Sequence, residues 1–206
     1  MISVDNILDV EQYLDDVEGV IFDLDDTLYS EKDYVKSGYK AIAEQFPDIE
    51  DAERKLWNAF LNGEKAIDNV FASTGMEGKK AAALQIYREH MPTIELYEGV
   101  ANMLHRIKES GKKIGLITDG RPEGQRNKIA SLKLKVDEII VTDELGGIQY
   151  RKPNAKAFEL MKERMQMDYK RMIYIGDNIS KDFIAPKELG MKVIYFKNAD
   201  GLYYVG

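Results

Sequence analysis

Several residue types are missing or scarce in this sequence, and each absence excludes a class of site. The 206-residue chain contains no cysteine, which excludes disulfide scaffolds, thiolate metal sites and a cysteine nucleophile. It contains only two histidines, His90 and His105, so a zinc site with three histidine ligands cannot be built. These classes are therefore excluded before any motif is considered.

Long apolar runs and an excess of positive charge are also missing. No run approaches the roughly 20 apolar residues of a membrane helix, and the first residues, MISVDNILDVEQ, lack the basic and apolar regions of a signal peptide. With 29 Lys and Arg against 36 Asp and Glu, the net charge of −7 argues against a nucleic-acid partner, which would need a basic face. The sequence therefore predicts a cytoplasmic protein with no membrane or nucleic-acid partner, and leaves a monomer and a homodimer open.

Five short runs rich in valine, isoleucine and aromatic residues are expected to be strands. None alternates between apolar and polar residues, which indicates strands buried on both faces, as in a parallel sheet. Helical patterns separate most of them, so the sequence predicts an α/β fold with a doubly wound, Rossmann-like, mostly parallel sheet. The common order for such a sheet is 3-2-1-4-5, numbered along the chain. The runs are Val20–Phe22, Lys113–Ile117, Glu138–Val141, Met172–Ile175 and Val193–Phe196.

One interval is too long for a single crossover helix. Roughly 90 residues lie between the first two expected strands. Apolar residues recur there at helical spacing, and glycine and proline interrupt the pattern at Pro47, Gly63, Gly75 and Pro92. We interpret residues 31–92 as a helical subdomain inserted into a core formed by residues 1–30 and 93–206.

The first expected strand leads directly into an acidic segment, Asp23-Leu24-Asp25-Asp26-Thr27-Leu28. Its three carboxylates repel one another, and a bound cation would relieve that repulsion. Mg²⁺ prefers a few carboxylates together with waters and substrate phosphate. Taken alone, however, an acidic surface turn explains the segment equally well.

A second acidic loop, residues 176–182, follows the fourth expected strand and contains Asp177 and Asp182. In the predicted strand order, the first and fourth strands are neighbours at the point where the order reverses. Ligands bind outside the carboxyl ends of the strands at such a point. Two acidic loops that are far apart in the sequence would thus converge on one crevice, which favours a metal site over a surface turn.

Two further positions complete the expected pocket. Thr118 ends the second strand, so its hydroxyl and the backbone that follows at Asp119 face the same crevice, and Lys152 lies before a helix in the connection to the fourth strand. A single threonine or lysine is ordinarily a capping or solvent-facing residue. Beside a metal, however, a hydroxyl and an ammonium group supply the hydrogen bonds and positive charge that a bound phosphoryl group needs.

Taken in order, these segments resemble the four motifs of the haloacid dehalogenase superfamily of phosphohydrolases. The motifs are the segment 23–28, Thr118 after an apolar strand, Lys152-Pro153, and Gly176-Asp177 with Asp182; they bracket residues 20–182. The first motif is highly specific and the fourth fairly specific, whereas the other two carry little information alone. Residues 31–92 resemble the helical cap of this family, which closes over the active site.

The resemblance implies a Mg²⁺-dependent phosphatase that acts on a small phosphorylated metabolite, such as a sugar phosphate, a nucleotide or a phosphorylated acid. Asp23 would attack phosphorus and form an aspartyl-phosphate. Asp25 would protonate the leaving oxygen and then deprotonate the hydrolytic water. Thr118, Asp119 and Lys152 would bind the phosphoryl group.

The resemblance also implies the ligands of the ion. Mg²⁺ would be held by Asp23, by the backbone carbonyl of Asp25 and by Asp177, while Asp182 would position waters of the metal. Asp26 stands where many members of the superfamily carry glycine, and no role is assigned to it.

Other readings of the same residues stay open. A phosphomutase of the superfamily uses the same four motifs, and a member that only binds its ligand would retain them. A receiver domain, which is a phospho-aspartate signalling switch, combines similar residues, but the helical insertion and the Gly-Asp loop argue against it. A dehalogenase would need neither Asp25 as a proton donor nor a carboxylate metal site.

Four residues outside the motifs have two readings each. Arg121 and Arg126 follow Thr118 closely, and either contacts to an anionic substrate or surface salt bridges would explain them. Trp57 and Phe60 could contact substrate from the cap, but their helical spacing favours core packing.

Overall fold

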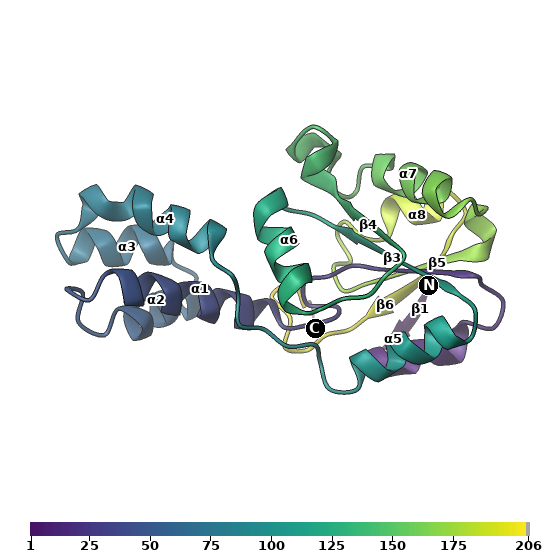
Figure 1. The fold of residues 1–206 in the computed structure, drawn as a ribbon, viewed down its shortest axis with the longest axis horizontal. Helices are drawn as coiled ribbons and strands as arrows, with labels where there is room; N and C mark the ends of the chain where they lie inside the picture. Colours follow the sequence, from purple (N-terminus) through teal and green to yellow (C-terminus); the bar gives the residue numbers. More distant parts are fainter. Residues whose placement is uncertain (205–206) are drawn as a thin grey trace.

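The computed structural model describes residues 1–204, and within them six strands form one sheet (Figure 1). The strands are β1 (Ile2–Val4), β2 (Gly19–Phe22), β3 (Lys113–Thr118), β4 (Glu138–Val141), β5 (Met172–Gly176) and β6 (Lys192–Phe196). Their order across the sheet is β1-β6-β5-β2-β3-β4, and every neighbouring pair is parallel. The predicted α/β fold and the predicted order of five strands are therefore confirmed.

One strand was not predicted. The three residues of β1 pair with β6 at the edge of the sheet, where Ser3 lies opposite Tyr195. A run of three residues with a central serine is too short to be distinguished from a loop by its apolar pattern.

Side chains of the strands alternate between two apolar layers. In β2, Val20 and Phe22 point into one layer and Ile21 into the other, and all three are fully buried. Burial on both faces explains why the strands show no alternation of apolar and polar residues. The first layer is covered by the 3₁₀ helix η1 (Ile7–Tyr13), α5 (Val100–Glu109) and α6 (Pro122–Ser131), and the second by α7 (Lys156–Met165) and α8 (Ile184–Glu188).

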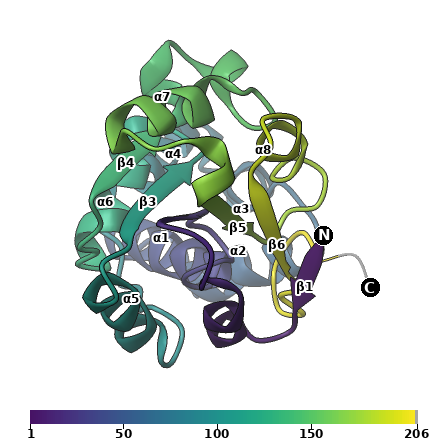
Figure 2. The same ribbon diagram turned by 90° about the vertical axis from the view of Figure 1, so that its right-hand side faces the viewer.

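Four helices between β2 and β3 form a separate group beside the sheet (Figure 1), and they lie behind the sheet in Figure 2. These inserted helices are α1 (Glu31–Gln45), α2 (Ala52–Leu61), α3 (Ala66–Ser73) and α4 (Lys80–Glu89). Ile42, Leu56 and Phe71 are fully buried in an apolar cluster of their own. The helical spacing of these side chains places them on the inward faces of the helices, so the group has its own core.

The inserted helices meet the sheet at one edge. The loops after β2, β3 and β5 line a pocket together with side chains of α1 and α4. Short 3₁₀ segments occupy other connections: η2 (Glu77–Lys79), η3 (Thr142–Leu145), η4 (Ile148–Tyr150) and η5 (Tyr169–Arg171). Among the described residues, no helix is both long and apolar enough to cross a membrane.

Candidate active site

The segment after β2 turns sharply at the carboxyl edge of the sheet. Asp23 still extends the ladder, because its backbone N–H donates to the carbonyl oxygen of Ile175 at 2.8 Å. The Leu28 N–H then donates back to the Leu24 carbonyl at 3.0 Å, and both leucine side chains are fully buried. The buried leucines fix the turn, and the carboxyl groups of Asp23 and Asp25 line the pocket.

Three carboxylates from two loops lie together at this edge. Oxygens of Asp23, Asp177 and Asp182 are all within 4.8 Å of one another, and the three residues are buried. A Cβ atom at Gly176 would overlap with the carboxyl group of Asp182, so the absence of a side chain at residue 176 allows this close approach. The two acidic loops therefore meet, as the predicted strand order requires.

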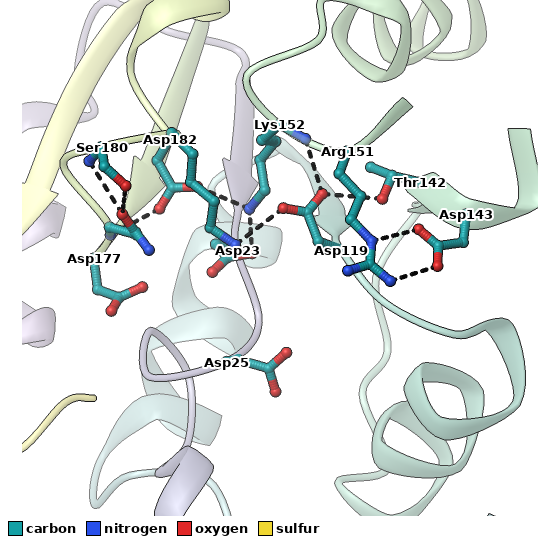
Figure 3. A network of polar contacts seen from close by, with 12 residues as sticks. Asp23, Asp25, Asp119, Thr142, Asp143, Arg151, Lys152, Asp177, Ser180 and Asp182 are labelled. Carbon is teal, nitrogen blue, oxygen red and sulfur yellow. Dashed lines mark hydrogen bonds and ion pairs between the residues drawn. The ribbon is translucent and has the colours of Figure 1, made fainter. Parts of the chain in front are cut away.

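Lys152 connects the carboxylates (Figure 3). Its Nζ donates to Asp23 Oδ1 at 2.5 Å and to the Tyr174 hydroxyl at 2.9 Å, and lies 2.8 Å from Asp182 Oδ1. The Asp182 Oδ2 accepts from the Asn178 N–H at 2.9 Å, so both oxygens of Asp182 are engaged within the protein. The Asp177 carboxylate accepts from the Thr27 hydroxyl at 3.3 Å.

The cluster carries more negative charge than Lys152 neutralises. Burial raises the pKa of Asp23 to about 7, although the Lys152 ammonium opposes the rise. Burial, followed by the charges of Asp23 and Asp182, raises the pKa of Asp177 to about 9. Burial alone would lower the pKa of Lys152, but Asp182 and Asp23 hold it well above its usual range. Buried carboxylates that resist ionisation next to one ammonium group are a suitable site for a divalent cation.

Asp25 points away from this cluster (Figure 3) and has a separate set of partners. Its carboxylate accepts hydrogen bonds from Lys128 Nζ at 2.7 Å, from Gln125 Nε2 at 3.0 Å and from the Tyr29 hydroxyl. Burial raises the pKa of Asp25, but Lys128 and the hydrogen bonds lower it further than burial raises it, so the net pKa is depressed. None of these three partners of Asp25 was predicted from the sequence. The i, i+3 spacing of Gln125 and Lys128 on one helix was the only available signal.

Thr118 and Asp119 follow one another at the end of β3 but are placed differently. The Thr118 hydroxyl is buried and has no hydrogen-bond partner within the described residues. Asp119 is fully engaged: Oδ1 accepts from the Thr142 hydroxyl and the Lys152 N–H, both at 3.0 Å, and Oδ2 accepts from Lys181 Nζ at 3.0 Å. The carboxylate of Asp119 is therefore occupied in positioning its neighbours.

A pocket of about 430 Å³ lies over these groups. Its lining includes the carboxyl groups of Asp23, Asp25, Asp119 and Asp177 on the sheet side. Tyr34 and Arg88 of the inserted helices, Arg121 before α6 and Tyr203 also line the pocket. The inserted helices thus contribute side chains to the same pocket as the carboxylates.

Arg126, Trp57 and Phe60, for which the sequence left two interpretations open, lie away from this pocket. Arg126 donates to both carboxylate oxygens of Glu144, at 2.9 and 2.7 Å, so it forms a surface salt bridge. Trp57 stacks on Phe60 with ring centroids 5.2 Å apart and packs on the core of the inserted helices. Neither aromatic residue lines the pocket over Asp23.

Comparison with known proteins identifies the family. Residues 20–196 match the family of haloacid dehalogenase-like hydrolases. The chain belongs to this family. As a member of the haloacid dehalogenase-like hydrolases, it also resembles individual proteins over most of its length, which confirms the resemblance drawn from the four motifs.

Two curated relatives and one solved structure illustrate the range of proteins to which this chain is similar. A glyceraldehyde 3-phosphate phosphatase of Methanocaldococcus jannaschii is 29% identical over 191 residues, which cover 85% of this chain and 82% of the relative. An (S)-2-haloacid dehalogenase of Pseudomonas putida is 22% identical, covering 91% of this chain and 87% of the relative. The HAD-hydrolase YfnB of Bacillus subtilis, solved with bound magnesium, has a TM-score of 0.61 at 19% identity, covering 87% and 86% of the two chains; at that identity it supports the fold alone.

Proposed function

We propose that this hydrolase is a Mg²⁺-dependent phosphatase that cleaves a small phosphomonoester through an aspartyl-phosphate on Asp23. The main support is the arrangement of Asp23, which lines the pocket and is held by the buried Lys152 next to two further carboxylates. A second carboxylate, Asp25, lines the same pocket outside the cluster and is available for proton transfer.

The donor set fits Mg²⁺. All three clustered side chains offer hard oxygen ligands, and the raised pKa values of Asp23 and Asp177 reflect uncompensated negative charge that a divalent cation would offset. Asp23 and Asp177 are the better candidates for direct side-chain ligands, because both oxygens of Asp182 already bind Lys152 and the loop backbone. When bound, the ion supplies positive charge that stabilises the phosphoryl oxygens.

The first step is attack by Asp23 on phosphorus. Lys152 holds the Asp23 carboxylate in one orientation at 2.5 Å, and its ammonium charge is well placed to stabilise the negative phosphoryl oxygens as the bond to the leaving oxygen breaks. The Thr118 hydroxyl, buried and without a protein partner, provides a further hydrogen-bond donor for the same oxygens. Asp119 contributes by positioning Lys152 and Lys181 through its carboxylate.

Asp25 transfers a proton both when the aspartyl-phosphate forms and when it is hydrolysed. The pKa of Asp25 is depressed, so the carboxylate is ionised at neutral pH and can accept a proton from the hydrolytic water in the second step. The first step requires its protonated form, which gives its proton to the leaving oxygen as the bond to phosphorus breaks. A phosphate dianion bound beside Asp25 raises the pKa of that carboxyl, because like charges disfavour ionisation.

Glyceraldehyde 3-phosphate is our first candidate substrate, because the phosphatase of Methanocaldococcus jannaschii carries that name. The inserted helices α1–α4 would act as a cap, since Tyr34 and Arg88 line the same pocket as the carboxylates. A dehalogenase is disfavoured because its reaction would leave Asp25, its three hydrogen-bond donors and the buried carboxylate cluster without a use.

Phosphate release from a panel of phosphorylated metabolites, with Mg²⁺ and with EDTA, tests this proposal. We expect release only with Mg²⁺, with glyceraldehyde 3-phosphate and other small phosphoesters among the substrates. Failure to release phosphate from any compound, together with chloride release from a 2-haloacid, would overturn it. Rearrangement of a sugar phosphate without free phosphate would point instead to a phosphomutase.

A further inference from the structure

Asp26 is a buried residue of the nucleophile loop, residues 23–28 after β2, and its carboxylate makes contacts beyond that loop. Its backbone adopts φ 54°, in the left-handed region that glycine adopts without strain. The residue is 1% exposed, and its carboxylate binds the nearby start of α1 and a segment 176 residues away. Oδ1 accepts from the Glu31 N–H at 2.8 Å at the start of α1, and Oδ2 accepts from the Leu202 N–H at 2.7 Å. An aspartate at this position therefore supplies two hydrogen bonds that glycine could not.

The segment 198–204 is held against the nucleophile loop at a second point. Asn198 Nδ2 donates to the backbone oxygen of Asp26 at 2.7 Å and to the Tyr97 hydroxyl at 2.8 Å. The Asn198 Oδ1 accepts from the Asp200 N–H at 3.1 Å, which turns the chain back on itself. Together with the bond to Leu202, these contacts direct the segment along the loop that carries Asp23.

Tyr203 is the part of this segment that reaches the pocket. It lines the pocket together with Asp25, Glu31 and Lys181, and the ammonium of Lys181 lies 6.0 Å from the centre of its ring. Tyr203 is 50% exposed, so part of its surface is available to a molecule in the pocket. Its neighbour Tyr204 is similarly exposed but does not line the pocket.

We propose that Asp26 is a positioning residue that anchors the segment 198–204, and that Tyr203 on this segment contacts the leaving group of the substrate. The proposal rests on the phosphatase function proposed above. In the proposed reaction the phosphoryl group binds at the Asp23 cluster. Tyr203 lines the same pocket but does not belong to that cluster, so it is placed to contact the remainder of the substrate. The phenol group supplies an apolar ring and a hydroxyl that both donates and accepts, which suits a small hydroxylated or carbonyl-bearing leaving group.

Hydrogen–deuterium exchange tests the anchoring without any assay of activity. Asp26→Gly preserves the backbone conformation but removes both acceptors, so exchange of a peptide that spans residues 199–204 should accelerate by roughly tenfold or more. In Asp26→Asn only one oxygen remains for two donors, and we expect an intermediate acceleration. Tyr203→Ala should leave the exchange of the Leu202 amide near the wild-type rate, because it keeps the acceptor.

Steady-state kinetics test the contact with the leaving group. For the best substrate of the panel, Tyr203→Ala should raise KM by roughly tenfold while kcat changes by less than about threefold. The inhibition constant of inorganic phosphate, which has no leaving group, should stay unchanged. Tyr204→Ala is the matched control, and we expect wild-type values of KM and kcat for it.

The outcomes separate the two proposals. Equal exchange rates in the wild type and both Asp26 variants would overturn the anchoring. Unchanged KM in Tyr203→Ala, or an equal rise in Tyr204→Ala, would overturn the contact with the leaving group while the wild-type activity still upholds the phosphatase. A wild-type protein that hydrolyses nothing would overturn the phosphatase and with it the role of Tyr203, and the exchange data would still decide the anchoring.

Discussion

Lys128 Nζ lies 2.7 Å from Asp25 Oδ1, so a lysine on α6 is paired with the carboxylate to which the proton transfers are assigned. Both side chains are largely buried, at 6% and 17% exposure. The ammonium also lies 4.1 Å from the centre of the Tyr34 ring, which faces it from α1. The protonation state of Asp25 therefore depends on a residue that the four motifs do not include.

The first prediction concerns Lys128→Met. The pKa of Asp25 is lower in the folded protein than in the unfolded chain. The ionised carboxylate therefore stabilises the fold at a pH above its pKa in the unfolded chain, and this contribution is lost as the pH falls through its pKa in the folded protein. Without Lys128, the pKa of Asp25 rises, and the acidic limb of the kcat profile should move toward neutral pH. Loss of one partner of a buried pair should also lower the free energy of unfolding at pH 7 by about 3 kcal/mol. Profiles of kcat against pH and chemical denaturation measure the two effects.

Lys128→Arg is the control for this change, because it keeps the charge and alters only its geometry. We expect its acidic limb to stay close to that of the wild type. An acidic limb that does not move in Lys128→Met would show that the pair does not set the titration of Asp25.

The fold and the motif residues could be predicted because their signals are local. Uninterrupted apolar runs mark strands buried on both faces, and the parallel order then brings the ends of β2 and β5 together. From that order alone, Asp23 and Asp177 had to lie close to one another. The apolar runs came from the sequence, whereas the strand order came from the common arrangement of doubly wound sheets.

The partners of Asp25 could not be predicted in the same way. The inward face of α6 includes Gln125 and Lys128 as well as apolar residues, so an apolar pattern does not reveal which side of this helix is buried. In a sequence, a buried lysine paired with a distant carboxylate looks the same as a lysine on a solvated face. The role of Asp26 was hidden for a similar reason, since its partner Leu202 is 176 residues away and contributes only a backbone N–H.

The second prediction concerns Asp23→Asn. Loss of the nucleophile should lower kcat by roughly 10⁴-fold or more, as removal of a covalent nucleophile does in other hydrolases. The pKa of Asp23 is raised to about 7, so ionisation of this carboxyl group destabilises the folded wild type as the pH rises from about 4. The variant lacks this charge, and at pH 8 it should be no less stable than the wild type. Phosphate release and thermal unfolding test the two statements, and acid-stable labelling by radioactive substrate should be lost with the activity. An active Asp23→Asn protein would overturn the assignment of Asp23 as the nucleophile.

The third prediction concerns the pH dependence of metal binding. In the metal-free protein the pKa of Asp23 is about 7 and that of Asp177 about 9, so both bind protons more tightly than in the unfolded chain. Their contribution to stability is therefore present at low pH and is lost as the pH rises through those values. Mg²⁺ has to displace these protons, so its binding should strengthen as the pH rises. We therefore expect the difference in Tm between about 5 mM Mg²⁺, a concentration chosen to exceed Kd, and EDTA to grow from pH 6 to pH 9.

Two variants make this measurement specific. Asp177→Asn should reduce the Mg²⁺-dependent increase in Tm and raise the Tm in EDTA at pH 9, because it removes one repelling charge. Asp168→Asn alters a carboxylate that is 80% exposed and should behave as the wild type. A stabilisation by Mg²⁺ that is constant across the pH range, or equal in Asp177→Asn, would contradict a metal site at this cluster.

The fourth prediction uses the Thr118 hydroxyl, which is buried and lacks a hydrogen-bond partner among the residues that the structure describes. A structural hydroxyl in the interior would have a partner, and its removal would cost stability. Thr118→Val keeps the shape of the side chain and removes a group that makes no bond, so the free energy of unfolding should be unchanged or slightly higher. If the hydroxyl donates to a phosphoryl oxygen, the same variant should lose about 2 kcal/mol of transition-state stabilisation, or roughly 30-fold in kcat/KM. Thr118→Ser should restore the activity. A loss of stability with wild-type kcat/KM would instead show that the hydroxyl serves the fold.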